Sequence, residues 1–387
     1  MEKDFEKGYF DTIRPFNDDE VQAAISRLLD TPHFRAALNF VFPSMDANTL
    51  EAQLRSISTV DEFQAKIISN AVVAIIQSST AGLHSSGLDK LHADKGYLCI
   101  SNHRDIVLDS AFLNYLLFKQ KLPTTRIAIG SNLLQAPWIE DLVKLNKNFI
   151  VNRNIQPRQA YEYSLLLSRY IRFSIESDLS SVWIAQKEGR SKDGIDQTQT
   201  GLLKMLGMSS DEGALGYEKL NIVPVSISYE FEPCAGLKAQ EIYMKSLTGS
   251  YQKAEGEDLR SMQIGIVRPK GNVHFHFSEP LSKESIHDAF QSGNRNEAMK
   301  LIAEEIDKEI IKNFKLFPNN FIAFDLFNHS ETFSQQYTIS DKGVFERYLN
   351  EELNQLQGDR DALKLHLLHI YINPLVRKMD LGFLSIN

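Results

Sequence analysis

One histidine and two carboxylates follow an apolar stretch of the sequence, and together they could perform acid–base chemistry. His103 comes after the strand expected over 97–101, and Asp105 and Asp109 stand where a helix is expected over about 106–119. The positive end of a helix disfavours the imidazolium form of a histidine, and a nearby carboxylate can fix its tautomer. We therefore identify His103 as a candidate general base, with Asp109 or Asp105 as the carboxylate that orients it.

A short basic segment stands out in a chain that is acidic as a whole. Residues 144–158 contain two lysines and two arginines and no acidic residue, whereas the net charge of the chain is −8. Local positive charge of this kind attracts anions. Arg153 follows a strand expected over 148–151, so this segment predicts an anion site near the end of that strand.

Two further segments complete the candidate site. Residues 184–194 contain Gly189, where a ligand can approach the backbone, and the side chains of Arg190 and Lys192 can donate hydrogen bonds to an anion. Residues 222–229 form an apolar stretch with a proline, Pro224, and such a strand could form one wall of a pocket.

In their order and spacing, these four segments resemble the four sequence blocks of the glycerolipid acyltransferase superfamily, especially its glycerol-3-phosphate acyltransferase branch. The first block of that family is an Asn-His pair followed by an aspartate, which Asn102, His103 and Asp109 match. The second is an apolar Phe-Ile that ends in arginine, the third is Glu-Gly-any-Arg-Ser, and the fourth is a proline within an apolar strand. The resemblance covers about residues 87–280, and residues 127–133 also resemble the family.

The resemblance implies a role for each matching residue. His103 would be the general base and Asp109 would orient it. The second and third blocks would hold the phosphate of the acceptor, and Pro224 would line the pocket. The residues implied in phosphate binding are Arg153, Glu188, Gly189, Arg190 and Ser191, to which the neighbouring Lys192 adds a donor.

The chain departs from the family pattern in two places. Five residues separate His103 from Asp109, one more than the family has, so Asp105 is an alternative partner for the histidine. In the third block Gly189 is followed directly by Arg190, and Lys187 can be aligned in place of Glu188. These departures indicate a divergent subfamily.

The pattern of elements predicts an α/β fold, with a mixed sheet flanked by helices. Residues 1–85 are expected to form an N-terminal helical unit, 86–320 the α/β acyltransferase domain, and 321–387 a helical C-terminal extension. The strands that we expect are 97–101, 126–130, 148–151, 181–186, 222–229 and 272–277, and the main helices of the α/β domain are 106–119, 135–145, 157–177, 235–247 and 296–314.

The composition of the chain bears on its cellular location and on the classes of partner that it can bind. The acidic balance, with a pI near 5.7, argues against a nucleic acid as the main partner. Cys99 and Cys234 are the only cysteines, so neither a disulfide framework nor a cysteine metal cluster is expected. The N-terminus lacks the apolar core of a signal peptide, and no apolar run approaches the ~20 residues of a membrane span. We expect a cytoplasmic protein that meets the inner face of the membrane peripherally.

Other histidines and motifs have simpler interpretations. His274 and His276 share one face of a strand, and His366 and His369 share one face of a helix, but no carboxylate spacing completes a zinc site. We therefore expect structural histidines and no metal. The triplet His103-Arg104-Asp105 also occurs in protein kinases, but no glycine-rich loop or Asp-Phe-Gly segment accompanies it here.

The function expected from the resemblance is an O-acyltransferase of phospholipid biosynthesis. It would move a fatty acyl group from acyl-CoA or acyl carrier protein to a hydroxyl of glycerol 3-phosphate or lysophosphatidate, with no cofactor. The partners implied are the acyl thioester, the phosphate-bearing acceptor, a membrane surface and an acyl carrier protein. Two alternatives stay open: a different lipid acceptor, such as a hydroxyacylated amino acid, and a non-catalytic lipid-binding scaffold.

Overall fold

A mixed sheet lies at the centre of the protein. The computed structural model describes residues 8–43, 45–153 and 155–385, and within them the sheet has seven strands in the order β1-β7-β6-β2-β5-β3-β4. The strands are β1 (Gly82–Ser86), β2 (Leu98–Ser101), β3 (Arg126–Gly130), β4 (Asn148–Val151), β5 (Val182–Ala185), β6 (Ile222–Tyr229) and β7 (Asn272–Phe277).

Strand direction brings the candidate residues to one edge. Strands β6, β2, β5, β3 and β4 run parallel to one another, β7 runs antiparallel to β6, and β1 runs parallel to β7. The carboxyl ends of the five parallel strands therefore meet at the same edge, which is where ligands bind in open α/β sheets. The predicted fold class, a mixed sheet flanked by helices, is confirmed.

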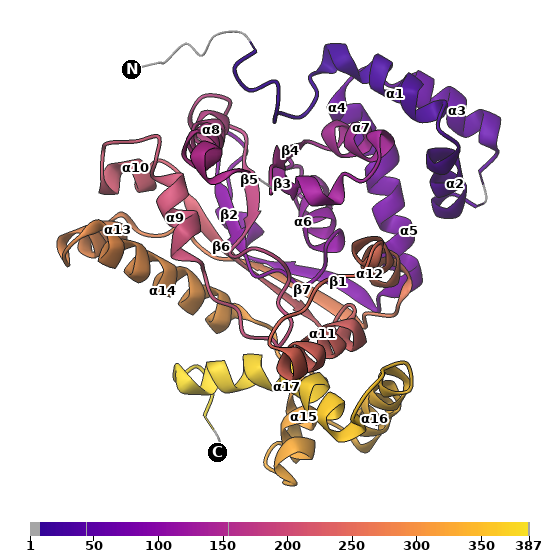
Figure 1. The fold of residues 1–387 in the computed structure, drawn as a ribbon, viewed down its shortest axis with the longest axis vertical. Helices are drawn as coiled ribbons and strands as arrows, with labels where there is room; N and C mark the ends of the chain where they lie inside the picture. The colour runs from indigo at the N-terminus through magenta and orange to yellow at the C-terminus, as the bar shows by residue number, and fades with distance from the viewer. Residues whose placement is uncertain (1–7, 44, 154, 386–387) are drawn as a thin grey trace.

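Helices cover both faces of the sheet (Figure 1). Along β2, Leu98 and Ile100 pack into the core on one face and Cys99 into the core on the other, as the two-residue period of a strand requires. The first face is covered by α8 (Pro157–Glu176), α9 (Thr200–Leu206), α10 (Ala214–Glu218), α13 (Lys283–Gln291) and α14 (Arg295–Asn313). The second is covered by α5 (Ser69–Ser79), α6 (Leu108–Lys119) and α12 (Glu257–Val267).

The N-terminal helices brace the edge of the sheet that carries β4. They are α1 (Val21–Leu29), α2 (Pro32–Val41), α3 (Ala47–Arg55) and α4 (Val60–Phe63), with a π-helical turn (Gln64–Ile68) leading into α5. Their apolar faces form one core with Leu145 of α7 (Pro137–Leu145), the helix that precedes β4. Short 3₁₀ helices lie at η1 (Asp18–Glu20), η3 (Leu88–Lys90), η4 (Ser131–Leu133) and η5 (Ser334–Gln336).

The C-terminal helices pack on the α/β domain through α11 (Ala235–Thr248). They are α15 (Pro318–Asn328), α16 (Ile339–Leu353) and α17 (Arg360–Asp380), and they share a core with Ala235 and Ala239 of α11. Gly194 fits closely under α17, because a Cβ atom there would lie 2.5 Å from the carbonyl oxygen of Ile370. The C-terminal helices therefore contact the loop that follows β5.

Helix α14 holds the same loop from the other side. Asp307 of α14 accepts hydrogen bonds from the backbone N–H and the hydroxyl of Thr198, at 2.8 and 2.6 Å through Oδ1. Burial raises the pKa of Asp307 to about 6, although the two hydrogen bonds from Thr198 act in the opposite direction.

Asp307 should make the stability of the protein depend on pH. Because its folded pKa of about 6 lies above the usual value of 3.8, its favourable contribution is present below pH 3.8 and is lost as the pH rises through 6. The free energy of unfolding of the wild type, relative to Asp307→Asn, should therefore fall by about 3 kcal/mol between acid and neutral pH. Denaturant unfolding of both proteins at several pH values measures this difference, and a difference that stays constant or rises with pH would contradict the prediction.

Candidate active site

The structure brings His103 and Asp109 together between β2 and α6. His103 lies two residues beyond β2, and Asp109 lies in the first turn of α6. The Nδ1 atom of His103 is 2.8 Å from Oδ2 of Asp109. The histidine side chain is 14% exposed, while the aspartate is fully buried. The pairing that the sequence favoured is therefore present despite the additional residue between them.

Asp109 accepts hydrogen bonds through both of its oxygen atoms. Its Oδ2 accepts, besides the contact to His103, the backbone N–H groups of Arg104 at 2.6 Å and Asp105 at 3.0 Å. Its Oδ1 accepts the hydroxyl of Tyr229, the last residue of β6, at 2.9 Å. An ionised carboxylate accepts hydrogen bonds through both oxygens, so this set of donors suits the charged form of Asp109.

Asp105 caps the helix and does not contact the histidine. Its Oδ1 accepts the backbone N–H groups of Val107 at 2.9 Å and Leu108 at 2.8 Å, as a helix-capping aspartate does. The additional residue is thus accommodated in a capped turn before α6. Asp105 is buried, and burial followed by the charge of Asp109 raises its pKa. Its Oδ2 has no hydrogen-bond partner among the described residues, and α12 approaches it at Gly265.

The imidazole of His103 is held on one side and free on the other. Its ring contacts the ring of Trp183 edge to face, with 5.8 Å between the centroids. The backbone is fixed as well, since the carbonyl of His103 accepts the N–H of Ser191 at 2.8 Å. No described residue hydrogen-bonds Nε2. With Nδ1 engaged by Asp109, Nε2 is the nitrogen that could take a proton from a substrate.

Asn102 fixes the position of this loop against the sheet. Its amide nitrogen donates to the carbonyl of Ile227 at 2.9 Å, and its side-chain oxygen accepts the N–H of Ile227 at 2.8 Å. This pair of bonds continues the contact between β2 and β6 beyond the end of β2. The two bonds therefore fix the position of the backbone at His103 relative to β6.

The predicted phosphate ligands fall into two groups. In the first group, Arg153 and Glu188 form an ion pair at 3.1 Å, and the Glu188 side chain is 68% exposed. The backbone N–H of Arg153 donates to the hydroxyl of Ser131, which follows β3. Lys187, the alternative to Glu188, donates to the carbonyl of Ile195. These side chains lie at the ends of β3, β4 and β5, and none of them hydrogen-bonds His103.

The second group lies beside the histidine loop. Arg190 is 8% exposed, its Nη1 has no hydrogen-bond partner among the described residues, and its charge acts on Asp105. Ser191 is buried, and its hydroxyl also has no partner there. Lys192 pairs with Glu241 of α11. Burial, followed by the charge of Arg190, lowers the pKa of Lys192 to about 8, so two cations lie close together here.

Gly189 and Pro224 satisfy backbone requirements. Gly189 has a φ of +74°, which favours glycine, and no atom lies within 4 Å of where its Cβ would be. Pro224 lies inside β6, whose residues are all buried, beside the position where the ladder with β7 ends at Val225 and Phe277. A proline at the end of a ladder leaves few sheet hydrogen bonds unmade. It lines neither of the two pockets described below.

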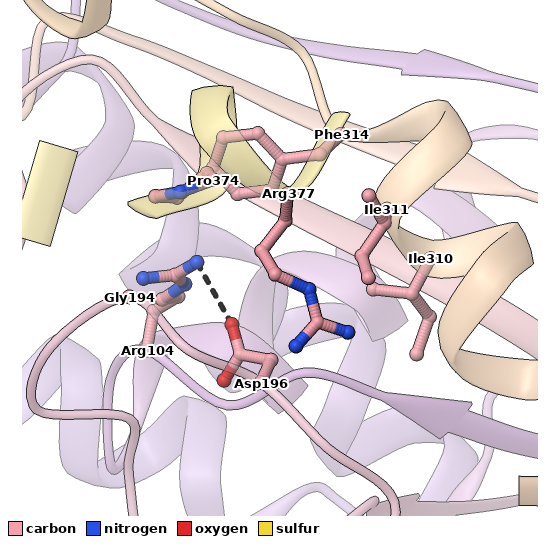
Figure 2. A pocket seen from close by; sticks show the side chains of 8 residues that line it. All are labelled: Arg104, Gly194, Asp196, Ile310, Ile311, Phe314, Pro374 and Arg377. Carbon is pink, nitrogen blue, oxygen red and sulfur yellow. Dashed lines mark ion pairs between the residues drawn. The ribbon is translucent and has the colours of Figure 1, made fainter. Parts of the chain in front are cut away.

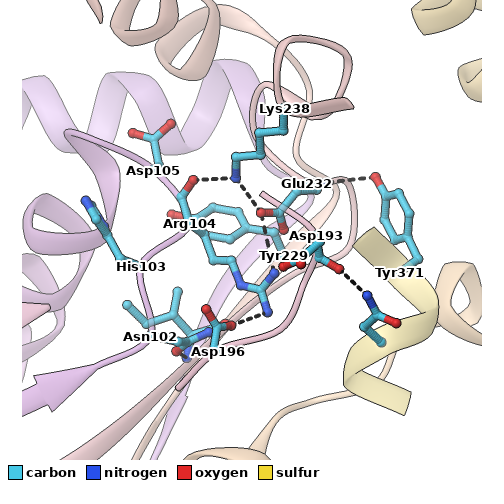
Figure 3. Close-up of polar contacts among 12 residues, drawn as sticks. Asn102, His103, Arg104, Asp105, Asp193, Asp196, Tyr229, Glu232, Lys238 and Tyr371 are labelled. Carbon is cyan, nitrogen blue, oxygen red and sulfur yellow. Dashed lines mark hydrogen bonds and ion pairs between the residues drawn. The ribbon is translucent and has the colours of Figure 1, made fainter. Parts of the chain in front are cut away.

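Sequence reasoning missed a buried ionic network around Arg104 (Figure 3). The Arg104 side chain pairs with Asp196 at 2.8 Å and with Glu232 at 3.7 Å. Lys238 of α11 donates to Glu232 at 2.6 Å and to the backbone carbonyl of Arg104 at 2.7 Å. Helix α17 joins the network, because the hydroxyl of Tyr371 accepts the N–H of Glu232. The network fixes the peptide that follows His103, and no local motif in the sequence signals it.

Two pockets lie beside the loop that follows β5. One is a small pocket beneath Arg104 and between α14 and α17 (Figure 2), and it is lined by Arg104, Gly194, Asp196, Ile310, Ile311, Phe314, Pro374 and Arg377. The other is an open hollow, lined by Lys187, Ile195, Gln197, Thr198, Gln199, Thr200 and Gly201.

Two further histidines, His274 and His276 on β7, share a hydroxyl partner. The hydroxyl of Ser86 on β1 lies 3.2 Å from Nε2 of His274 and 2.8 Å from Nδ1 of His276. Burial lowers the pKa of His274 to about 4. Over the described ranges, no three His, Cys, Asp or Glu side chains are grouped so that they could hold a metal ion. Likewise, none of the helices in the described part of the chain is long and apolar enough to cross a membrane.

The sequence is similar to several known acyltransferases. A dihydroxyacetone phosphate acyltransferase from Bos taurus is 23% identical over 216 residues, which cover 54% of this chain and 30% of that protein. A glycerol-3-phosphate acyltransferase from Pseudomonas fluorescens is 25% identical over 260 residues, covering 63% and 30%. One from Actinobacillus pleuropneumoniae is 22% identical over 326 residues, covering 78% and 38%. The matches thus span less than two fifths of the length of these relatives.

One solved structure and one family model also match this chain. The structure of the 1-acyl-sn-glycerophosphate acyltransferase PlsC from Thermotoga maritima matches 75% of this chain and 93% of that chain, with 12% identity and a TM-score of 0.36. The acyltransferase family model matches residues 82–228, which run from β1 to the residue before the end of β6 and include His103, Asp109, Arg153 and Arg190. Residues 82–228 therefore resemble the acyltransferase family, and the low identities to glycerol-3-phosphate acyltransferases support a divergent relative of the glycerolipid acyltransferase superfamily.

Proposed function

We propose that this protein transfers a fatty acyl group from a thioester of coenzyme A or acyl carrier protein to a hydroxyl of glycerol 3-phosphate or lysophosphatidate. The observation that carries the proposal is the His103–Asp109 pair, which leaves Nε2 of the histidine free at the carboxyl edge of the sheet. The family match over residues 82–228 supports the acyl-transfer chemistry.

His103 would act as a general base and then as a general acid. Nε2 takes the proton of the acceptor hydroxyl as its oxygen attacks the thioester carbonyl, and Asp109 stabilises the imidazolium that forms. The C–O bond forms, the C–S bond breaks, and the proton on Nε2 passes to the departing thiolate. The products are an ester and a free thiol, so atoms and charge balance without a cofactor.

Arg190 and Lys192 would hold the phosphate of the acceptor. Their cationic groups are buried together beside Ser191, whose N–H binds the carbonyl of His103. Nη1 of Arg190 also has no hydrogen-bond partner among the residues that the structure describes, and a phosphate oxygen would supply one. Binding there would place the glycerol hydroxyl near the histidine, which lowers the entropic cost of the reaction. When lysophosphatidate is the acceptor, both it and the acyl thioester carry acyl chains. We therefore propose that the protein works at a membrane surface.

An acceptor panel tests this function. The assay measures thiol release from a long-chain acyl-CoA and from acyl carrier protein with glycerol 3-phosphate, dihydroxyacetone phosphate, lysophosphatidate or a hydroxyacylated amino acid. We expect release that depends on a phosphate-bearing acceptor and is absent without one. Release with the amino acid alone would assign the carboxylate acceptor instead. Liposome binding without release on any acceptor would favour the non-catalytic scaffold.

A further inference from the structure

Tyr229 contacts the His103–Asp109 pair, although it lies far along the sequence from both residues. It is the last residue of β6, one position beyond the end of the family match at residue 228. Val225, Ile227 and Tyr229 alternate along β6 so that all three pack on the α6 side of the sheet. Because Asn102 binds both backbone groups of Ile227, the place of Tyr229 relative to the histidine loop is fixed.

The two oxygen atoms of Asp109 are held very differently. Oδ2 lies within hydrogen-bond distance of three nitrogen atoms, those of the His103 ring and of the next two backbone N–H groups. In the described part of the chain Oδ1 has one hydrogen-bond partner, the hydroxyl of Tyr229 at 2.9 Å. Without that hydroxyl, Oδ1 would be a buried acceptor with no donor among the described residues, and only the contacts of Oδ2 would resist rotation of the carboxylate about its Cβ–Cγ bond. The plane of the carboxylate therefore depends on Tyr229.

Tyr229 suits a fixed donor better than a proton carrier. The side chain is 3% exposed, and its hydroxyl donates a hydrogen bond to the buried Asp109. Burial, followed by the charge of Asp109, raises the pKa of Tyr229 well above its ordinary value. The hydroxyl thus stays protonated and neutral while the imidazole gains and loses its proton.

We infer that Tyr229 is a positioning residue for acyl transfer: its hydroxyl holds Oδ1 of Asp109 so that Oδ2 stays aligned with Nδ1 of His103. This inference rests on the proposed function. Tyr229 does not touch the substrate, and its effect passes entirely through Asp109. It should therefore influence how fast the proton is transferred and leave substrate binding unchanged.

The test is a double-mutant cycle of Tyr229→Phe with Asp109→Ala. In the wild-type background we expect Tyr229→Phe to lower kcat roughly three- to thirtyfold with little change in KM, because a hydrogen bond to a charged group is lost. In the Asp109→Ala background the same change should alter kcat less than about twofold, since the group through which it acts is gone. An equal effect in both backgrounds, or no effect in either, would overturn the inference.

A matched control separates positioning from general stability. Tyr217 is also buried, and its hydroxyl donates to the carbonyl of Leu203 at 2.8 Å on the opposite face of the sheet. Tyr217→Phe should cost similar stability while leaving kcat unchanged in both backgrounds. A fall in kcat as large as that of Tyr229→Phe would show that the effect is not specific to Asp109.

A spectroscopic measurement keeps this inference separate from the proposed function. The proton shared by His103 and Asp109 should give a low-field NMR resonance that is absent in His103→Ala. Tyr229→Phe should move or broaden that resonance, and Tyr217→Phe should not, even if every acceptor tried proves wrong. A resonance that Tyr229→Phe leaves unchanged would count against the inference, whereas absence of acyl transfer by the wild type would count against the proposed function alone.

Discussion

Replacing His103 by alanine is expected to lower kcat of acyl transfer roughly 10²- to 10⁴-fold, the usual contribution of a positioned general base. The hydroxyl of the acceptor would then have no group to take its proton, while the residues proposed to bind the phosphate stay in place. KM for both substrates should change little. Asp109→Asn keeps the size of the side chain and removes its charge, so its kcat should lie between those of the wild type and His103→Ala. Steady-state thiol release measures both.

An exposed histidine provides the control for this prediction. His287 lies on α13, and its side chain is 51% exposed. It pairs with Glu218 of α10, and neither residue belongs to the candidate site. His287→Ala should retain wild-type kcat. The account would be contradicted if His103→Ala, with an unchanged melting temperature, released thiol as fast as the wild type.

The second large effect is expected at Arg190. Arg190→Met should raise KM for a phosphate-bearing acceptor roughly 10- to 100-fold, since hydrogen bonds to charged groups contribute about 1.5–3 kcal/mol. Arg153→Met should have a smaller effect, because Arg153 is already paired with Glu188 and is more exposed. The measurement is the KM for glycerol 3-phosphate, with glycerol as the matched acceptor that lacks the phosphate.

The comparison between the two arginines decides which group holds the phosphate. If Arg153→Met raises KM more than Arg190→Met does, the phosphate binds at the ends of β3 and β4 and not beside the histidine loop. If Arg190→Met affects glycerol and glycerol 3-phosphate equally, the side chain supports the fold and does not recognise the phosphate. Either result would contradict the assignment made here.

Much of the sheet could be predicted because its strands are apolar and end at turn residues. The bounds expected for β3, β4, β6 and β7 are those of the structure, β2 begins one residue later than expected, and β5 is one residue shorter at each end. β1 was missed because Gly82–Ser86 is short and contains a glycine and two serines in place of β-branched residues. It also begins before the expected domain boundary at residue 85, just as α15 begins before the boundary at 321.

Short helices were harder to predict than long ones. α8 and α14 were expected within one residue of their observed ends, because an apolar stripe repeats along each. α9, α12 and α13 were not expected. The buried positions of α12 are only Ser261 and Gly265, so its packing does not depend on the apolar stripe that sequence reasoning looks for.

The contact between His103 and Asp109 was predictable, and its surroundings were not. His103 and Asp109 lie close enough in the sequence for spacing alone to suggest their contact. Asp105 binds backbone N–H groups at the start of α6, so Asp109 and not Asp105 pairs with His103. Which carboxylate pairs with the histidine therefore depends on where α6 begins. Tyr229 and Lys238 reach the loop from more than a hundred residues away, so only the three-dimensional fold brings them there.

The most direct test of the account follows the acyl group itself. A long-chain acyl-CoA is incubated with glycerol 3-phosphate and the wild type or His103→Ala, and the products are identified by mass spectrometry. The account predicts an acylglycerol phosphate, formed in equal amount to the free thiol, with the wild type and at least a hundredfold more slowly with His103→Ala. Free fatty acid in place of the ester, or ester formed equally fast by both proteins, would contradict it.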